Sequence, residues 1–387
     1  MENKSGYLNI SLLVGLKNNL EYTQLFYSTT RKLYSTTEIV FVSYGSTDGT
    51  HEWLDSLRDE YLKYYYFDEI KSLADTYNKC LDIATKEYCV LLHNDMILTS
   101  NFLENLLKHL NNNTVVGYSY IEPPIFSSDL RIGKILYDLG TDTQNIRLEE
   151  LEKVSLQIQN NDNNKISSGI ELRFFISLKT NRLRSINGLD NLFNPMFFED
   201  DDMFLRLEKL NLKFITSLDA ICYHFVSKTS RFSEEIIEKT KLIERKSQRN
   251  FQRKWGFSSY SDKRRTLNIG ILLRNGSIPL MREIEPCCSH LYTDTDYTKY
   301  IVEEQPNTKF DLNERISHLN TAIPIKHYDI LIQIDGSLFV DRQLKYIKYI
   351  YNTIDKRYNN FLKKIIFMLS GKQIKKKGLI ISVNNYK

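Results

Sequence analysis

The alternation of strand-like and helix-like segments over the first 120 residues constrains the fold most strongly. Runs of β-branched, aromatic and aliphatic residues alternate with helical stretches of roughly 10–15 residues. The strand-like runs are residues 8–14, 38–43, 62–67, 88–93 and 115–120, and the helical stretches are residues 19–33, 48–57, 72–85 and 101–110. This alternation predicts an α/β fold with a mostly parallel sheet flanked by helices. Since such sheets bind ligands at the carboxyl ends of their strands, residues 43–48 and 93–95 become candidate site segments.

The rest of the chain predicts a loose stretch, further helices and a second domain. Residues 122–165 contain two consecutive prolines and an Asn-rich run, so we predict a variable excursion or flexible loop there. Order resumes at residues 170–178 and 197–210, and residues 233–255 predict a charged amphipathic helix. Strand-like runs at 267–273, 290–292 and 329–334 and a helical run at 343–354 predict a smaller C-terminal α/β domain. Because single cores stop growing near roughly 250–300 residues, we predict two domains, 1–256 and 257–387.

Composition and charge narrow the class of protein only slightly. The 52 Lys and Arg against 48 Asp and Glu leave a net charge of +4, which is too weak to indicate a nucleic-acid partner. Five cysteines without a CxxC pair favour a reducing compartment over a disulfide framework or a zinc cluster. The N-terminus lacks the pattern of a signal peptide, and no run approaches the ~18 apolar residues of a transmembrane segment. We therefore expect a cytoplasmic protein.

Two candidate site segments follow predicted strands. Residues 43–50 (SYGSTDGT) form a Gly- and Ser-rich turn between a strand and a helix, where backbone N–H groups suit a nucleotide or phosphate. A helix cap with turn glycines is the plain alternative. His93, Asn94 and Asp95 follow the next buried strand, and a carboxylate beside an amide there can hold a divalent cation. The plain alternative is again a turn or helix cap.

A third candidate segment is the acidic run Glu199, Asp200, Asp201 and Asp202. Four consecutive acids repel one another unless a cation, a base-requiring reaction or Arg206 offsets them. An acidic first helical turn, which the helix dipole favours, is the alternative. Further along, His224 precedes a basic, hydroxyl-rich stretch in which Lys228 and Arg231 suit a phosphate clamp.

Taken together, residues 8–256 resemble the family 2, GT-A type inverting glycosyltransferases. GSTDGT (residues 45–50) is similar to the nucleotide-binding turn of that family, and residues 72–95 resemble its helix, strand and DXD-type metal motif. Residues 187–207 resemble its glycine turn and glutamate–aspartate catalytic motif. Tyr-His-Phe at 223–225 fits the late metal-binding histidine, and residues 250–256 resemble a frequent closing segment. Each motif is weak alone, but five in the family's order form a specific pattern.

The resemblance implies a Rossmann-like GT-A fold and transfer of a sugar from a UDP- or GDP-sugar to a hydroxyl on a glycan, protein or lipid-linked acceptor. It implies Asp95 and His224 as ligands of Mn²⁺ or Mg²⁺, and the nitrogen ligand favours Mn²⁺. Asp200 would be the general base, Glu199 would orient the acceptor or the base, and Asp202 with Arg206 would fix the helix. The implied donor-binding residues are Ser43, Tyr44, Gly45, Asp48, Asn78, Asn94, Asp95, Lys228 and Arg231.

Two departures from the family pattern leave alternatives open. Ser43 and Tyr44 stand where the family usually has a base-reading acid, so a uracil bound through Ser43 and another base stacked on Tyr44 are both open. His93 and Asn94 stand where a further acid is common, which implies weaker metal binding or help from His93. A nucleotidyltransferase and a degenerate transferase acting as a nucleotide- or glycan-binding scaffold are the competing functions. For the C-terminal domain, acceptor binding, homodimerisation and a remnant of a second catalytic domain are all open.

Overall fold

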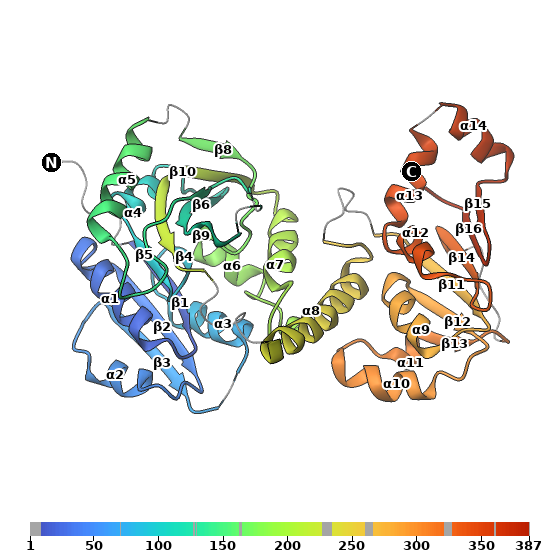
Figure 1. The fold of residues 1–387 in the computed structure, drawn as a ribbon, viewed down its shortest axis with the longest axis horizontal. Helices are drawn as coiled ribbons and strands as arrows, with labels where there is room; N and C mark the ends of the chain where they lie inside the picture. Colours follow the sequence, from blue (N-terminus) through green and yellow to red (C-terminus); the bar gives the residue numbers. More distant parts are fainter. Residues whose placement is uncertain are drawn as a thin grey trace. The chain divides into compact units, whose positions relative to one another are not determined.

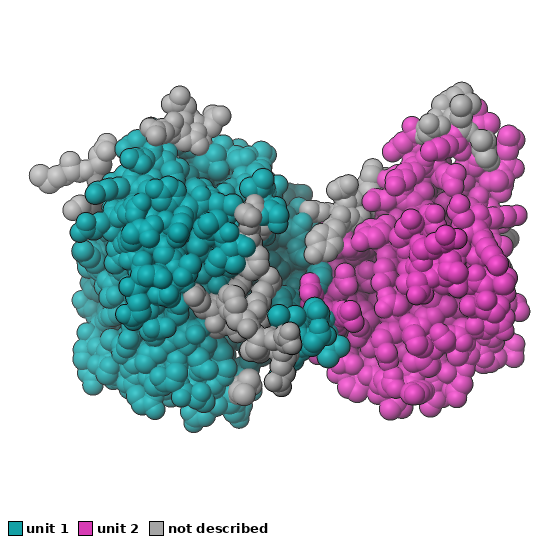
Figure 2. Space-filling model, viewed as in Figure 1, with its two compact units in different colours: residues 1–243 teal, residues 244–387 magenta. Residues whose placement is uncertain are grey.

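The computed structural model describes residues 9–69, 71–126, 128, 130–161, 165–226, 234–259, 266–320, 327–359 and 361–386. The chain forms two compact units, residues 1–243 and 244–387, which Figure 2 shows in different colours. Each unit has its own β-sheet (Figure 1). The division falls inside helix α8 (Glu234–Trp255), whereas the sequence placed the domain boundary after this helix.

The first unit is built on a ten-stranded, mostly parallel sheet, as the sequence predicted. Its strands are β1 (Ile10–Leu16), β2 (Glu38–Tyr44), β3 (Leu62–Phe67), β4 (Tyr88–His93), β5 (Met96–Leu98), β6 (Thr114–Glu122), β7 (Lys134–Leu136), β8 (Ile166–Ser168), β9 (Ile176–Lys179) and β10 (Lys213–His224). The main path runs β3-β2-β1-β4-β9-β6-β10-β5. Strands β1 to β4 pair in parallel, as do β6 and β10, while β9 joins β4 to β6 in antiparallel fashion.

The central strands are buried on both faces, which explains their nearly continuous apolar sequences. Every residue of β2 and β6 is buried. Helix α3 (Leu73–Ile83) packs against β1 and β2, and Gly15 permits its close approach. A Cβ atom at Gly15 would lie 2.8 Å from the ring of Tyr77. Helix α3 is therefore packed closely on the face of the sheet.

The other helices of the first unit are α1 (Leu20–Leu33), α2 (Thr50–Ser56), α4 (Phe102–Leu107), α5 (Leu148–Asn161), α6 (Thr180–Ser185) and α7 (Glu199–Glu208), with 3₁₀ turns at Pro124–Phe126 and Asn191–Phe193. All helices and strands predicted before residue 121 are present. The prediction of a loop across residues 122–165 was wrong for α5. Its charged residues masked an amphipathic pattern, whose buried Leu151 and Val154 pack into a cluster with Ile121.

The second unit contains a six-stranded sheet in the order β13-β12-β11-β14-β16-β15. Its strands are β11 (Ile269–Arg274), β12 (His290–Thr293), β13 (Ile316–His318), β14 (Ile330–Asp335), β15 (Gln373–Lys376) and β16 (Leu379–Val383). Its helices are α9 (Ile278–Ile284), α10 (Thr298–Glu304), α11 (Leu312–Arg315), α12 (Leu344–Lys348), α13 (Ile350–Tyr358) and α14 (Phe361–Leu369), with 3₁₀ turns at Glu285–Cys287, Gln305–Asn307 and Asp341–Gln343. This sheet with its helices confirms the predicted α/β architecture of the C-terminal region. The single helix predicted at 343–354 is divided between α12 and α13.

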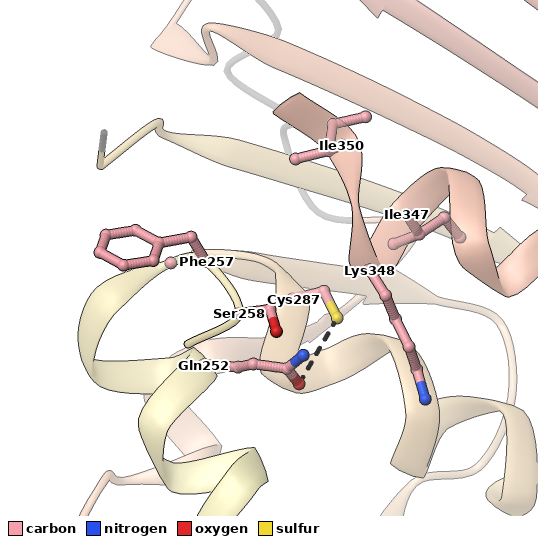
Figure 3. Close-up of a pocket in the computed structure, with 8 residues that line it drawn as sticks. Gln252, Phe257, Ser258, Cys287, Ile347, Lys348 and Ile350 are labelled. Carbon is pink, nitrogen blue, oxygen red and sulfur yellow. Dashed lines mark hydrogen bonds between the residues drawn. The ribbon is translucent and has the colours of Figure 1, made fainter. Parts of the chain in front are cut away.

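A buried ion network stabilises the second unit. The carboxylate of Glu285 accepts hydrogen bonds from Arg253 at 2.7 Å, Arg315 at 2.6 Å and the Tyr300 hydroxyl at 2.9 Å. The side chains of Arg253 and Glu285 are fully buried. A cavity of about 10 Å³ lies nearby, where the Cys287 thiol donates to Oε1 of Gln252 at 3.8 Å (Figure 3). A space of this size holds at most a water molecule, so it is no ligand site.

Among the residues that the structure describes, no helix combines the length and the apolar character that crossing a membrane requires.

Candidate active site

The parallel sheet brings its candidate functional groups to one edge. Strand β2 ends at Tyr44, β4 at His93, β6 at Glu122 and β10 at His224. Because these strands run in the same direction, their carboxyl ends lie on the same side of the sheet. This is the side where open α/β sheets bind ligands.

His93, Asp95 and His224 form a cluster of potential metal ligands. One ligand atom from each lies within 4.8 Å of the others. Nε2 of His224 is 3.5 Å and Nδ1 of His93 is 4.0 Å from Oδ1 of Asp95. The antiparallel pairing of β5 with β10 sets this proximity, because the N–H of Phe225 donates to the carbonyl of Asp95 at 3.0 Å. Two imidazoles and a carboxylate are a donor set that fits a divalent transition-metal ion such as Mn²⁺.

Glu122 and Lys134 fix the orientation of His224. Nδ1 of His224 lies 2.8 Å from Oε1 of Glu122, and Nζ of Lys134 lies 3.0 Å from Oε2 of the same carboxylate. The lysine side chain is only 2% exposed. With Nδ1 held in this way, Nε2 faces Asp95, which is how a carboxylate behind a ligating histidine usually acts. The sequence did not single out Glu122, because only its position at a parallel strand end marks it.

Burial and charge set the protonation of the cluster. Burial lowers the pKa of His93 to about 4, against the opposing charge of Asp95, so its imidazole is neutral. Burial raises the pKa of Asp95, but the charge and hydrogen bond of His224 lower it further, to about 2. Burial also lowers the pKa of His224, whereas Asp95 and Glu122 raise it to about 9. In the metal-free protein, the imidazolium of His224 and the side chain of Lys134 together balance the charges of Asp95 and Glu122.

Residues 173–175 connect this cluster to the acidic helix α7. The rings of Phe174 and Phe175 lie 4.9 Å and 5.2 Å from the ring of His93. The preceding residue, Arg173, forms an ion pair with Asp201 in the first turn of α7. This short segment therefore contacts the acidic turn through Arg173 and the cluster of potential metal ligands through Phe174 and Phe175. Arg173 was not recognised from the sequence, since nothing local distinguishes it from a surface arginine.

The four acids at the start of α7 have different environments. Asp201 is paired with Arg173, and Asp202 accepts a hydrogen bond from Arg206 at 2.7 Å, as the sequence predicted. Asp200 is half-buried. Among the described residues, the hydrogen bond that its carboxylate accepts comes from the N–H of its neighbour Asp201, at 2.8 Å. Glu199 is buried, and its Oε2 has no hydrogen-bond partner among the described residues.

Burial and like charge raise the pKa values of the two first acids. Burial raises the pKa of Glu199, and the charges of Asp200 and Asp201 raise it further. Burial also raises the pKa of Asp200, with Asp201 as a second cause and Arg173 opposing. A carboxylate whose pKa is moved upward toward neutrality is a stronger proton acceptor.

The predicted nucleotide turn is held together by its own side chains. Oγ of Ser43 lies 2.8 Å from Oγ of Ser46 and 3.0 Å from Nε2 of His51. The ring of Tyr44 stacks on Phe67, with centroids 5.0 Å apart and planes 6° from parallel. Ser43 and Tyr44 are buried. Their contacts with a nucleotide stay predictions, and a base stacked on Tyr44 would have to share that ring with Phe67.

Gly45, Asp48 and Asn94 order the backbone around the strand ends. Gly45 has a φ of 59°, in the left-handed region that favours glycine. The carboxylate of Asp48 accepts from the N–H of Leu20 at 2.8 Å, at the start of α1, so it acts as a cap. Nδ2 of Asn94 donates to Oγ1 of Thr23 at 2.9 Å. The sequence predicted a cap on the helix that follows the turn, but the bond of Asp48 is made to α1, and the N-cap residue of α2 is Gly49, which has no side-chain cap. The donor-binding role of Asp48 stays a prediction.

Asn78 is bonded to the glycine turn before α7. Its carboxamide donates to the carbonyl of Leu189 and accepts from the N–H of Leu189, both at 2.8 Å. We expect Asn78→Ala to lower the free energy of unfolding by about 1–3 kcal/mol, because two backbone groups lose their partner. Urea unfolding measures this loss. Asn78→Asp, which can keep the acceptor but not the donor, is the graded control; an unchanged stability in both variants would contradict this role.

Lys228 and Arg231, the predicted phosphate clamp, lie outside the described residues.

The mostly parallel sheet, the cluster of potential metal ligands and the acidic start of α7 are features that the resemblance to GT-A type glycosyltransferases predicted. The family model described as "Glycosyl transferase family 2" matches residues 11–165. Residues 11–165, less than half of the chain, therefore resemble family 2 glycosyltransferases, in line with the sequence resemblance. A comparison with curated proteins finds no match.

Three solved structures resemble the chain at low identity. The mannosyltransferase PcManGT from Pyrobaculum calidifontis, in complex with GDP-Man and Mn²⁺, is 16% identical with a TM-score of 0.39, over 57% of this chain and 57% of that one. GalNAc-T7 with UDP, GalNAc and Mn²⁺ is 10% identical with a TM-score of 0.44, over 57% and 44%. TarS from S. aureus is 16% identical with a TM-score of 0.39, over 56% and 60%. The match thus spans between 44% and 60% of those chains.

Proposed function

We propose that the protein is a metal-dependent inverting glycosyltransferase that moves a sugar from a nucleotide-sugar donor to a hydroxyl acceptor. The observation that carries this proposal is the meeting of His93, Asp95 and His224 at the strand ends, joined through residues 173–175 to the acidic start of α7. A divalent cation bound by Asp95 and His224 would neutralise charge on the departing nucleoside diphosphate. His93 is our candidate for a third ligand, and two nitrogen donors favour Mn²⁺ over Mg²⁺.

Asp200 acts as the general base in this proposal. Its carboxylate accepts the proton of the acceptor hydroxyl while the acceptor oxygen bonds to the anomeric carbon. The bond from that carbon to the diphosphate oxygen breaks at the same time, and its electron pair leaves with the diphosphate. One base on the face opposite the leaving group is sufficient for inversion, so the reaction needs no covalent intermediate. Glu199, with its buried oxygen beside Asp200, orients the acceptor or the base.

The donor lies over the turn of residues 43–50 and the strand ends in this proposal. Ser43, Tyr44, Gly45, Asp48, Asn78 and Asn94 line or support its place, with Lys228 and Arg231 on the phosphates. UDP- and GDP-sugars are both candidate donors, because the turn carries no base-reading acid. For the second unit, acceptor binding, homodimerisation and a remnant of a second catalytic domain all stay open.

A screen of UDP- and GDP-sugars with Mn²⁺, measuring release of the nucleoside diphosphate, tests the function. We expect one donor class to be turned over and the release to stop when the metal is chelated. NMR of the glycoside formed would show an anomeric configuration opposite to that of the donor. A retained configuration would contradict the single-base mechanism, and nucleotide binding without turnover would favour the scaffold alternative.

Replacing Glu122 by glutamine tests the orientation of His224. The amide removes the charge that holds Nδ1, so we expect the affinity for Mn²⁺ to fall by roughly 10- to 100-fold. Electron paramagnetic resonance of free Mn²⁺ measures this affinity without any substrate. Glu150→Gln, which removes an exposed partner of Arg147, is the matched control and should leave Mn²⁺ binding unchanged. Equal affinities in all three proteins would exclude a role for Glu122.

A further inference from the structure

The last 47 residues carry a strong positive charge, which the net charge of the whole chain does not reveal. Residues 341–387 contain twelve of the 52 Lys and Arg residues and only two of the 48 Asp and Glu residues. This segment therefore has a net charge of +10, whereas residues 1–340 have a net charge of −6. A concentration of this kind creates a local positive potential, although the whole chain is almost neutral.

Helix α14, within this segment, has an apolar face that is turned to solvent. Its inner side is fixed by Phe367, which is buried and packs edge-to-face on Tyr358 of α13 with centroids 5.4 Å apart. Ile365, Met368 and Leu369 are 43%, 50% and 83% exposed. Their spacing of three and four residues puts them on one stripe. At about 100° per residue, Ile365 and Leu369 lie on the side opposite to Phe367. A surface helix normally carries polar residues there.

Exposed lysines occur on α14 itself and in the hairpin that follows it. Lys364 lies on α14 itself and is exposed. The helix ends in a tight turn, in which the N–H of Lys372 donates to the carbonyl of Phe367 at 2.9 Å, and the chain enters β15 (Figure 1). Lys375 in β15 and Lys377 in the turn from β15 to β16 are both exposed.

We propose that α14 and the β15–β16 hairpin dock the protein on the surface of an anionic lipid bilayer. Apolar side chains flanked by lysines match the acyl boundary and the anionic headgroups of such a surface together. A nucleic acid would match the lysines but not the exposed stripe of Ile365, Met368 and Leu369. A second copy of this surface is disfavoured, since two segments of charge +10 repel each other.

Flotation of the full-length protein with vesicles tests the docking surface. We expect binding to phosphatidylcholine vesicles that contain 30% phosphatidylglycerol and little binding to pure phosphatidylcholine. The partition coefficient should fall roughly fivefold for each lysine removed, which Lys375→Glu/Lys377→Glu tests. It should also fall at 0.5 M salt, because salt screens the attraction between the lysines and the headgroups. Met368→Glu/Leu369→Glu should reduce it at least tenfold, because two apolar side chains no longer insert.

Val302→Glu is the matched control, since Val302 is a 69% exposed apolar residue of α10 outside the charged segment. It should bind vesicles like the unmodified protein, and thermal unfolding should show that every variant is folded. Absence of binding to the anionic vesicles would overturn the proposal. Full binding by Met368→Glu/Leu369→Glu would also overturn it, because the surface would then be a site for any polyanion, with RNA as the first such candidate.

Discussion

Replacing Asp200 by asparagine is expected to lower kcat by roughly 100- to 10,000-fold, because the variant has no group to accept the acceptor proton. Binding of the nucleoside diphosphate should be unaffected, since Asp200 is assigned to the acceptor. Steady-state kinetics with the donor found in the screen, together with nucleotide titration, separate the two effects. A decrease in nucleotide affinity equal to the decrease in kcat would assign Asp200 to the donor instead.

Asp202→Asn is the matched control on the same helix. Asp202 is fully buried and bonded to Arg206, so its amide should reduce stability and leave most of the turnover intact. An equal loss of kcat in both variants would indicate a disordered helix rather than a missing base.

The same assignment predicts a pH dependence. Asp200 must be ionised to act, and burial raises its pKa above the ordinary value of 3.8. The value of kcat/KM should therefore rise with pH along a limb that lies above pH 4, and this limb should disappear in Asp200→Asn.

Removal of Glu285 is expected to have the largest effect on stability. Glu285→Ala leaves Arg253 and Arg315 without their shared carboxylate in the interior of the second unit. Breaking a buried pair in this way costs about 3–5 kcal/mol of unfolding free energy. Chemical unfolding followed through a probe in the second unit measures it. Glu303→Ala is the control, because Glu303 pairs with Arg282 at the surface, and it should cost at most about 1 kcal/mol.

The stabilisation by Glu285 also has a defined pH dependence. Burial raises the pKa of Glu285, but Arg253 and Arg315 lower it below the ordinary value of 4.5. A carboxylate with a lowered folded-state pKa stabilises the protein fully above pH 4.5, and the stabilisation is lost as the pH falls below that value. The difference in stability between the unmodified protein and Glu285→Ala should therefore shrink on acidification. A constant difference between pH 7 and pH 3 would contradict the assigned ion network.

The sequence predicted elements best where an apolar run ends at turn residues. The bounds of β3 and β4 are those expected, since both runs are short and sharply limited. Helix α5 was missed because its apolar positions are few and its neighbours are charged. Similarly, the net charge of +4 concealed the basic C-terminal segment, because the net charge of −6 on residues 1–340 offsets most of the +10 on residues 341–387.

The candidate site was partly predictable for a related reason. His93, Asp95 and His224 bear metal-binding groups at or next to strand ends, so residue type and position together marked them. Glu122 and Arg173 acquire their roles only through tertiary contacts, with His224 on β10 and with Asp201 on α7. No local pattern contains that information. The pairing of distant strands supplies it for Glu122, and the packing of residue 173 against α7 supplies it for Arg173.

Calorimetric titration of UDP and GDP, with and without Mn²⁺, tests the central claim most directly. The claim is that the strand ends form a cation-assisted site for a nucleoside diphosphate around Asp95 and His224. We expect one of the two nucleotides to bind at least tenfold more tightly in the presence of Mn²⁺, and Asp95→Asn to abolish that gain. Equal affinity with and without Mn²⁺, or an undiminished gain in Asp95→Asn, would contradict the claim.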